Sequence, residues 1–373
     1  MSSTQQGLSA IRFLPKEKSP FFATLRKRVD AYFAETGKSR HADAGMRLKT
    51  IILLTGYLLP FASMVFFGMV GWNGYLLWIL MGISVAGIGM SVMHDANHGA
   101  YSSSQKINDL IGYSLNLLGG ASFNWKLQHN ILHHTYTNIS SHDEDIKDRA
   151  IMKFNPHSRR KGIQRFQHIY AFFFYGLITL YWVLAKDLVQ FFLFIRLGVN
   201  KNSAPENVLL FLRMTLTKIS YFALFIGLPL WMGMPAGFLV AGFILMHFTA
   251  GIILTLVFQM AHSVEGTSHP LPDADGVIHT DWAIHQMQTT KNFCRDNALL
   301  SWYLGGLNYQ VEHHLFPRIC HVHYPALSRI VESTAAEFGV PYLENKSFGS
   351  AFFSHINFLK SLGQLPSLNE AIG

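Results

Sequence analysis

Long apolar stretches alternate with polar stretches along this chain, and several are long enough to cross a bilayer. Residues 51–70 and 75–93 form one closely spaced pair, and residues 213–233 and 235–260 form a second. A helix needs about 20 predominantly apolar residues to span a membrane. The pattern therefore predicts an all-α integral membrane protein with about four transmembrane helices, arranged as two hairpins with short turns.

Residues 167–199 are also apolar and aromatic, but Lys186, Asp187 and Arg196 interrupt them. Polar clusters that share one site must lie on the same side of the bilayer, so an even number of crossings should separate them. This constraint favours four spans, with residues 167–199 lying along the membrane interface. The pattern itself is also compatible with a membrane-embedded helix, and the number of crossings here stays open.

Composition and charge support a membrane protein rather than a nucleic-acid-binding one. Half of the residues are hydrophobic, only 14% are charged and the mean hydropathy is +0.21. The net charge is +8, but ten of the lysines and arginines lie in residues 1–50, before the first long apolar stretch. Basic residues flank the cytoplasmic ends of membrane helices. We therefore expect the N-terminus to be cytoplasmic, with the C-terminus and the polar clusters on the same side.

The polar residues 1–48 are expected to form a cytoplasmic N-terminal segment, followed by one membrane domain over residues 49–373. This segment lacks the early apolar core that marks a signal peptide, so none is expected. Residues 21–33 have amphipathic spacing beside Arg26, Lys27 and Arg28. This segment could lie on the membrane surface or pack on the rest of the protein. The two cysteines are too few for a disulfide framework and form no CxxC pair.

Histidines gather in three short stretches. In the stretch 128–134, His129 and His133 are four residues apart, so an α-helix would place them on one face, with His134 about 100° further round. The other two stretches contain the spaced pair His94 and His98, and the adjacent pair His313 and His314 preceded by Gln310. His262 is isolated, but it follows the last predicted span directly. Three such clusters imply a site that the fold assembles, with room for more than one metal ion.

The kind of ligand narrows the choice of metal. Eight histidines exceed the needs of one zinc ion, and thiolate ligands are absent from the clusters. A shell of imidazole nitrogens suits two iron ions with open positions for dioxygen. Asp95 and Glu312 adjoin clustered histidines, where they could orient imidazole N–H groups or simply face solvent. His247 lies inside an apolar span, where it could line a substrate path or pack against other helices.

A metal site that opens into a bilayer faces acyl chains. Their C–H bonds are unactivated, so acid–base groups alone cannot remove hydrogen, whereas metal-activated oxygen can. The chain contains no glycine-rich nucleotide-binding loop, and Gly119-Gly120 does not form one. Reducing equivalents are therefore expected from a partner protein.

The stretches HDANH at 94–98, QHNILHH at 128–134 and QVEHH at 310–314 resemble the three histidine boxes of membrane fatty acid desaturases. A third box that begins with glutamine resembles the front-end group, which inserts a cis double bond between an existing one and the carboxyl end. The resemblance implies that eight histidines bind two irons, with Gln310 where relatives have a ninth. These implied ligands are His94, His98, His129, His133, His134, His262, His313 and His314.

The chain departs from many front-end enzymes because it lacks a fused cytochrome b5 domain with its HPGG motif. The resemblance therefore implies a separate electron donor, either a ferredoxin or a free cytochrome b5, and an acyl-CoA or acyl-lipid substrate. The basic run Arg159, Arg160 and Lys161 could bind the phosphates of an acyl carrier, or could be a solvated charge run. The alternatives are a fatty acyl hydroxylase or sphingolipid desaturase on the same site. A membrane metal transporter would instead place polar residues inside the spans.

Overall fold

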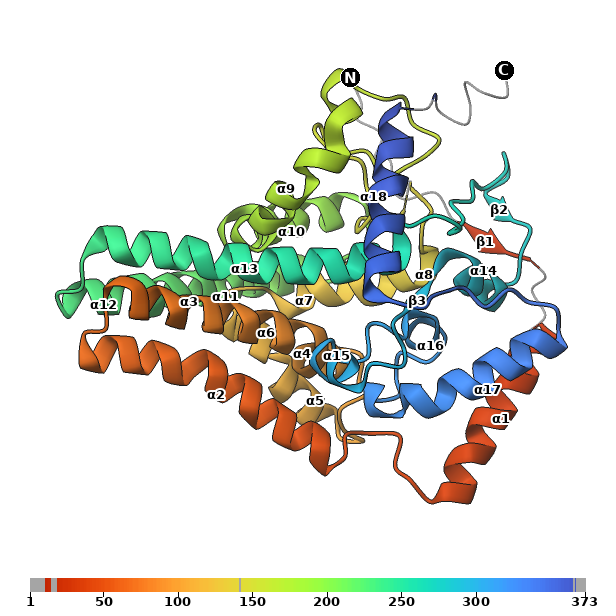
Figure 1. Cartoon of the computed structure of the whole chain (residues 1–373), viewed down its shortest axis with the longest axis horizontal. Helices are drawn as coiled ribbons and strands as arrows, with labels where there is room; N and C mark the ends of the chain where they lie inside the picture. The colour runs from red at the N-terminus through yellow and green to blue at the C-terminus, as the bar shows by residue number, and fades with distance from the viewer. Residues whose placement is uncertain (1–10, 15–18, 141, 365, 367–373) are drawn as a thin grey trace. The chain divides into compact units, whose positions relative to one another are not determined.

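The computed structural model describes residues 11–14, 19–140, 142–364 and 366 (Figure 1). The chain divides into two compact units. The first unit contains Asp43–Leu127 and Phe172–Leu256 and is almost entirely helical. The second unit contains the described parts of Ser9–Ala42, Gln128–Ala171 and Val257–Gly373. Each unit therefore draws on segments that are far apart in the sequence.

Five helices in the described part of the chain are long and apolar enough to cross a membrane: Ala44–Phe67, Gly71–Asn97, Gly162–Arg196, Ala204–Trp231 and Ala236–His262. Four of them overlap the predicted spans, with ends that differ by a few residues. The fifth, Gly162–Arg196, falls on the segment that the sequence left open, and it qualifies by length and composition. The helix that begins at Ala204 starts well before residue 213, because Ser203 and Glu206 form a capping box there and a proline occupies the first turn.

The elements of the first unit make up these long helices, except for α5, α6 and α7, which are separate short helices. Their bounds are α2 Ala44–Phe67, α3 Gly71–Gly87, η1 Ile88–Val92, α4 Met93–Asn97, α5 Gln105–Gly112, α6 Ser114–Leu117, α7 Ser122–Trp125, α9 Gln167–Tyr181, η4 Trp182–Lys186, α10 Asp187–Arg196, α11 Ala204–Phe222, η5 Ala223–Gly227, α12 Leu228–Trp231 and α13 Ala236–His262. Helix α9 begins in the second unit, and α13 ends there.

Helix α9 packs against α13 at backbone distance. A Cβ atom placed on Gly251 of α13 would lie 2.6 Å from the carbonyl oxygen of Gly176 on α9. A Cβ atom on Gly82 of α3 would similarly meet the Met246 carbonyl of α13 at 2.5 Å. Small residues at such crossings let membrane helices approach closely and maximise van der Waals contact. Both α3 and α9 are therefore held against α13 by glycines that admit no side chain.

A buried ion pair joins α10 to α11 within the first unit. The Lys218 ammonium lies 2.9 Å from a carboxylate oxygen of Asp187, and it also donates to the carbonyls of Gly119, Trp182 and Val183, each at 3.1 Å. The second Asp187 oxygen accepts from the Trp182 indole at 2.9 Å. Lys218 thus compensates the charge of Asp187 and also bonds two carbonyls of the π-helix η4, as a buried charge requires.

We expect Lys218→Met to lower the free energy of unfolding by about 3–5 kcal/mol, because it leaves the Asp187 carboxylate buried without its cation. The measurement is the melting temperature of the purified protein in detergent. Adding Asp187→Asn to the same chain should recover part of the loss, since it removes the uncompensated charge. If Lys218→Met alone has the melting temperature of the wild type, a stabilising role for the pair is contradicted.

The second unit combines short helices with two small parallel sheets. Its strands are β1 Arg12–Phe13, β2 Val277–Ile278, β3 Asn292–Phe293 and β4 Glu344–Asn345, with β1 paired to β2 and β3 to β4. Its helices are α1 Pro20–Thr36, η2 Lys126–His133, α8 His134–Tyr136, η3 Gly162–Phe166, α14 Trp282–Thr289, α15 Ala298–Tyr303, α16 Gln310–Leu315, η6 His321–His323, α17 Tyr324–Glu337 and α18 Phe348–Gln364. Helix η2 begins in the first unit.

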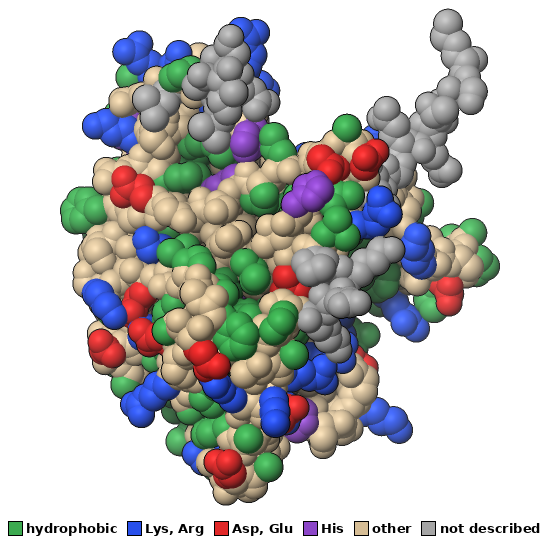
Figure 2. All heavy atoms as spheres, turned by 90° about the vertical axis from the view of Figure 1, so that its right-hand side faces the viewer, with side chains coloured by type: hydrophobic (Ala, Val, Ile, Leu, Met, Phe, Trp, Pro, Cys, Tyr) green, Lys and Arg blue, Asp and Glu red, His purple; other side chains and the backbone are tan. Residues whose placement is uncertain are grey.

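Helix α1 settles the two interpretations of residues 21–33. Phe21, Leu25, Val29 and Phe33 repeat every four residues and are buried in one core with residues of α17. The two helices lie side by side in Figure 1. Arg28 reaches Glu337 at 2.5 Å across the same contact. Figure 2 shows basic and acidic side chains intermixed over the face on which these helices lie. Segment 21–33 is therefore a packed helix of the second unit.

Candidate metal centre

The central histidine stretch forms a π-helix rather than an α-helix. Helix η2 ends at His133, and α8 continues from His134. A π-helix bonds i to i+5, so a residue five positions on returns to the same side. The Nε2 atoms of His129 and His134 accordingly lie 3.3 Å apart. The predicted α-helix is therefore wrong for this stretch, and His134 comes to the face of His129, whereas the rings of His129 and His133 still stack with centroids 5.2 Å apart, as their spacing predicted.

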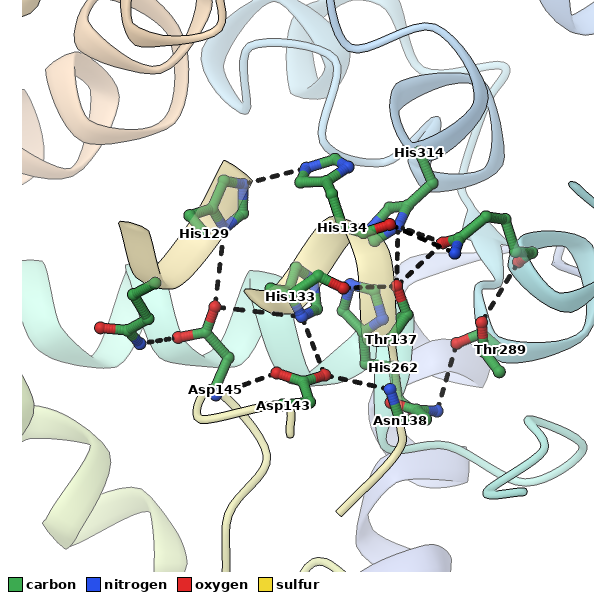
Figure 3. A network of polar contacts seen from close by, with 12 residues as sticks. His129, His133, His134, Thr137, Asn138, Asp143, Asp145, His262, Thr289 and His314 are labelled. Atoms are coloured by element: carbon green, nitrogen blue, oxygen red, sulfur yellow. Dashed lines mark hydrogen bonds and ion pairs between the residues drawn. The ribbon is translucent and has the colours of Figure 1, made fainter. Parts of the chain in front are cut away.

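Imidazole nitrogens from three elements of the second unit converge (Figure 3). His133 of η2, His262 at the end of α13 and His314 of α16 each offer a nitrogen within 4.8 Å of the others. His134, His313 and His314 form a second group with the same limit. The side chains of these histidines are buried. Two adjacent groups that share His314 are the arrangement expected of a site for more than one metal ion.

Unsatisfied nitrogens show that the site suits a metal. Within the described part of the chain, His133 Nε2 and His262 Nδ1 are buried and have no hydrogen-bond partner. A buried polar atom without a partner costs free energy, so native structures rarely leave one without a reason. Burial lowers the pKa of His129, with a smaller lowering from His133, although Asp145 opposes both. Neutral imidazoles of this kind are good ligands for iron.

Acidic side chains from the loop after α8 hold the outer nitrogens. The Asp143 carboxylate accepts from His133 Nδ1 at 2.9 Å and from the Asn138 backbone N–H at 3.0 Å. Asp145 lies 3.6 Å from His129 Nδ1, and the Gln128 side chain donates to it. Because Asp143 accepts at Nδ1, the proton of His133 sits there and its Nε2 lone pair is available to a metal.

Gln286 of α14 orients His314 in the same way. Its side-chain carbonyl lies 2.8 Å from His314 Nδ1 and accepts from Thr137 Oγ1 at 2.8 Å. Its amide nitrogen donates to the His134 carbonyl at 3.3 Å, which fixes the orientation of the amide. His314 is therefore protonated at Nδ1 and presents Nε2 to the centre.

Gln310 lies among the ligand nitrogens. Its amide nitrogen is 2.8 Å from His262 Nε2 and 3.3 Å from His314 Nε2. Exchange of the amide nitrogen and oxygen would place an acceptor oxygen at the same point. Its position in the site agrees with the prediction, whereas its direct ligation of a metal stays a prediction.

Glu312 faces away from the imidazoles and anchors α16. Its carboxylate accepts from the Asn292 side chain at 2.8 Å and from the Tyr342 hydroxyl at 2.7 Å. Asn292 lies on β3, and its side-chain oxygen accepts the Val311 backbone N–H at 2.8 Å. Burial raises the pKa of Glu312 to about 7, against the lowering effect of both hydrogen bonds. Glu312 thus positions the helix that carries His313 and His314, and not an imidazole directly.

We expect Tyr342→Phe to weaken metal binding about tenfold, within the range found for partners of metal ligands. The variant removes the only hydroxyl that bonds Glu312 among the described residues, and leaves one buried carboxylate oxygen without that donor. The measurement is the metal content of protein equilibrated at graded iron concentrations. Loss of secondary structure in the same sample would instead indicate misfolding, and unchanged metal content would contradict the positioning role.

The first unit places His94 and His98 on the last turn of the long helix that contains α3 and α4. Their ring centroids are 4.7 Å apart, and each lies 5.5 Å from the ring of Trp125 on α7. Asp95, which lies between them in the sequence, is buried in the structure. The pair therefore shares one face of a helix, as the spacing predicted.

The remaining predicted residues lie elsewhere. His247 is buried on α13, where its ring nitrogens meet Tyr221 at 3.0 Å and Thr179 at 3.3 Å, so it joins three membrane helices. Arg159, Arg160 and Lys161 are exposed in a loop before η3. Their role in substrate binding stays a prediction.

Sequence reasoning missed the residues that orient the ligands. Asp143 and Asp145 lie in an acidic run just after the central histidines, a signal that could have been used. Gln286, Asn292 and Tyr342 carry no local signal, because only folding brings them to the site. Their contribution could not be read from spacing.

The fold and the site thus define a multi-pass helical membrane protein whose buried imidazole clusters are compatible with metal binding. The profile of the family described as fatty acid desaturase matches residues 70–346. An sn-1 linoleoyl-lipid 6-desaturase of Synechocystis sp. is 36% identical over 96% of this chain and 99% of its own length. The protein of the same name from Arthrospira platensis is 35% identical, covering 93% of each chain. An acyl-lipid (8-3)-desaturase of Physcomitrium patens is 32% identical over 95% of this chain and 74% of its own. The chain belongs to the fatty acid desaturase family and is an oxidoreductase of lipid metabolism.

Proposed function

We propose that this protein is a front-end acyl-lipid desaturase, which inserts a cis double bond on the carboxyl side of an existing one. The observation that carries the proposal is the pair of imidazole groups that share His314 in the second unit. The names of the most similar relatives support the substrate class and the position of the new bond. The sequence motifs support a site that also uses His94 and His98.

The proposed metal is iron, held as two ions by the eight boxed and isolated histidines, with Gln310 as a possible further ligand. Bound iron would supply the oxidising power, drawn from dioxygen, that removes hydrogen from an unactivated C–H bond. The chain's own residues hold the imidazole rings in place and orient them. Asp143 keeps the proton of His133 on Nδ1, and Gln286 does the same for His314. Burial of these side chains excludes water from the nitrogens that face the centre.

The proposed electron donor is a separate ferredoxin or cytochrome b5. The proposed topology places both chain ends and the metal centre on the cytoplasmic side, on the basis of the basic residues before the first span. It requires an even number of crossings, so the helix Gly162–Arg196 is proposed to lie in or along the membrane without crossing it. Arg159, Arg160 and Lys161 would contact phosphates only if coenzyme A carried the acyl chain, and this role stays a prediction.

The test is a fatty-acid profile from a host that makes no polyunsaturated fatty acids. The host expresses the chain together with a ferredoxin and its reductase, and in a second strain with cytochrome b5. Linoleic acid and oleic acid are supplied, and the products are identified by gas chromatography and mass spectrometry. The matched control is the same chain with His133→Ala and His314→Ala.

A product lighter by two hydrogens, with its new double bond on the carboxyl side, is the expected result. A product heavier by one oxygen would replace the desaturase with a hydroxylase. A new bond on the methyl side would overturn the front-end assignment. Absence of any product with both donors, from protein shown to contain iron, would contradict the proposed reaction.

A further inference from the structure

A cleft of about 720 Å³ opens along α11 in the first unit. Its size falls in the range of small-molecule sites, about 300–1,000 Å³. One wall is the face of α11 from Glu206 to Tyr221, continued by η5, and the other comes from α6 and the segment that enters α7. Asn202 and Glu206 lie at the start of α11, Arg213 lies near its middle, and Leu224 and Phe225 lie beyond its end. The lining combines polar and apolar side chains, so the cleft suits a molecule that has both kinds of group.

Arg213 is the only lysine or arginine that lines this cleft. It is exposed, and no described residue forms a hydrogen bond or ion pair with it. The one carboxylate in the lining, Glu206, accepts from the Ser203 backbone and hydroxyl at 2.7 Å each. It lies seven residues before Arg213, about 10 Å along the helix axis. The guanidinium therefore faces the cleft without a protein anion.

The surroundings of Arg213 indicate which kind of anionic group would bind its guanidinium. The neighbouring side chains Leu209, Leu212 and Leu216 are 48%, 58% and 63% exposed, on a helix long and apolar enough to span a membrane. A helix surface of this kind contacts lipid, and the long side chain of an arginine on it can extend toward the headgroups. A lipid phosphate reaches Arg213 by lateral diffusion, whereas a soluble carrier would have to enter from water. Arginine also binds phosphate through two parallel hydrogen bonds.

The wall of the cleft continues to the histidine pair of the same unit. Ser122 and Phe123 line the cleft, and Trp125 on the same short helix contacts the rings of both His94 and His98. Asn124 anchors this helix by donating to the Asp187 carbonyl at 2.7 Å. A molecule in the cleft thus touches the helix that borders two of the proposed metal ligands.

We propose that this cleft binds the substrate as a whole glycerophospholipid, with Arg213 on its anionic phosphodiester and the acyl chain along α11 toward Leu224 and Phe225. The inference rests on the proposed function and deepens it. It makes Arg213 a determinant of headgroup selectivity. About 18 Å of helix separates Arg213 from Phe225, so the cleft would hold the carboxyl-proximal part of an 18-carbon chain.

The experiment compares headgroups on the same acyl chain. Wild type, Arg213→Gln and Arg196→Gln are reconstituted in nanodiscs of saturated phosphatidylcholine, with a reducing system. Each receives linoleoyl phosphatidylglycerol or linoleoyl galactosyl diacylglycerol, and linoleoyl-CoA forms a third arm. Arg196 is the control because it is an exposed arginine at the end of α10 and does not line the cleft. Native mass spectrometry of metal-free protein measures retention of phosphatidylglycerol independently of turnover.

The expected result is that Arg213→Gln lowers the ratio of kcat/KM for the anionic lipid over the galactolipid about tenfold, through KM, as loss of a charged hydrogen bond would. Retention of phosphatidylglycerol should fall in parallel, and Arg196→Gln should keep both values. An unchanged ratio with unchanged retention would overturn the inference, as would an equal effect on linoleoyl-CoA. If the wild type converts none of the three substrates while retention still depends on Arg213, the proposed function fails and the lipid site stands.

Discussion

His133→Ala should abolish desaturation and remove iron from the protein. His133 is fully buried, and its Nε2 points without a partner toward His262 and His314 in the described structure. Alanine cannot ligate, and the neighbouring imidazoles cannot move into its place, because Gln286 and the close packing of the rings hold them. The measurements are fatty-acid product and iron content per protein.

The control for this variant is His279→Ala. His279 is an exposed histidine whose side chain pairs only with Asp273 in the described structure, so its loss should change neither quantity. His133→Ala should remain in the membrane at wild-type levels, since the spans do not depend on it. Full activity in this variant would show that His133 is not a ligand.

Asp143→Asn should lower iron affinity and activity by about 10–100-fold, the range found for groups that orient metal ligands. The two Asp143 oxygens accept three hydrogen bonds, from His133 and from the backbone N–H groups of Asn138 and Asp145. An asparagine can accept at one oxygen only, so its NH2 group must face a donor. In either orientation, the negative charge that strengthens the hydrogen bond from His133 Nδ1 is lost.

Titration with iron separates a positioning role from general damage. A variant with a misoriented ligand should regain much of its activity at high iron concentration, whereas a misfolded protein should not. The neighbouring Glu144→Gln is the control, because Glu144 pairs with Lys147 at 2.6 Å and has no described contact with the histidines. Equal losses in both variants would argue against a specific role for Asp143.

The hydrophobic pattern was sufficient to predict those helices that depend only on the preference of each residue for lipid. The apolar stretches 51–70, 75–93 and 235–260 coincide with long helices, because each side chain's preference for lipid is independent of its neighbours. The segment 167–199 was harder, since Lys186 and Asp187 lower its mean hydropathy. Folding compensates Asp187 with Lys218, a pairing over 31 residues that no local pattern reveals.

The histidine motifs determined the chemistry of this protein, because a metal site depends first on the kind and number of its ligands. Tertiary structure decided everything that depends on distance. It showed that His134 turns to the face of His129, because η2 is a π-helix, and that Glu312 anchors a helix and not an imidazole. It also brought Asp143, Gln286 and Tyr342 to the ligands and their neighbours. Hydrogen bonds between residues far apart in the chain form only when the backbone has closed around them, so a single sequence contains no record of their geometry.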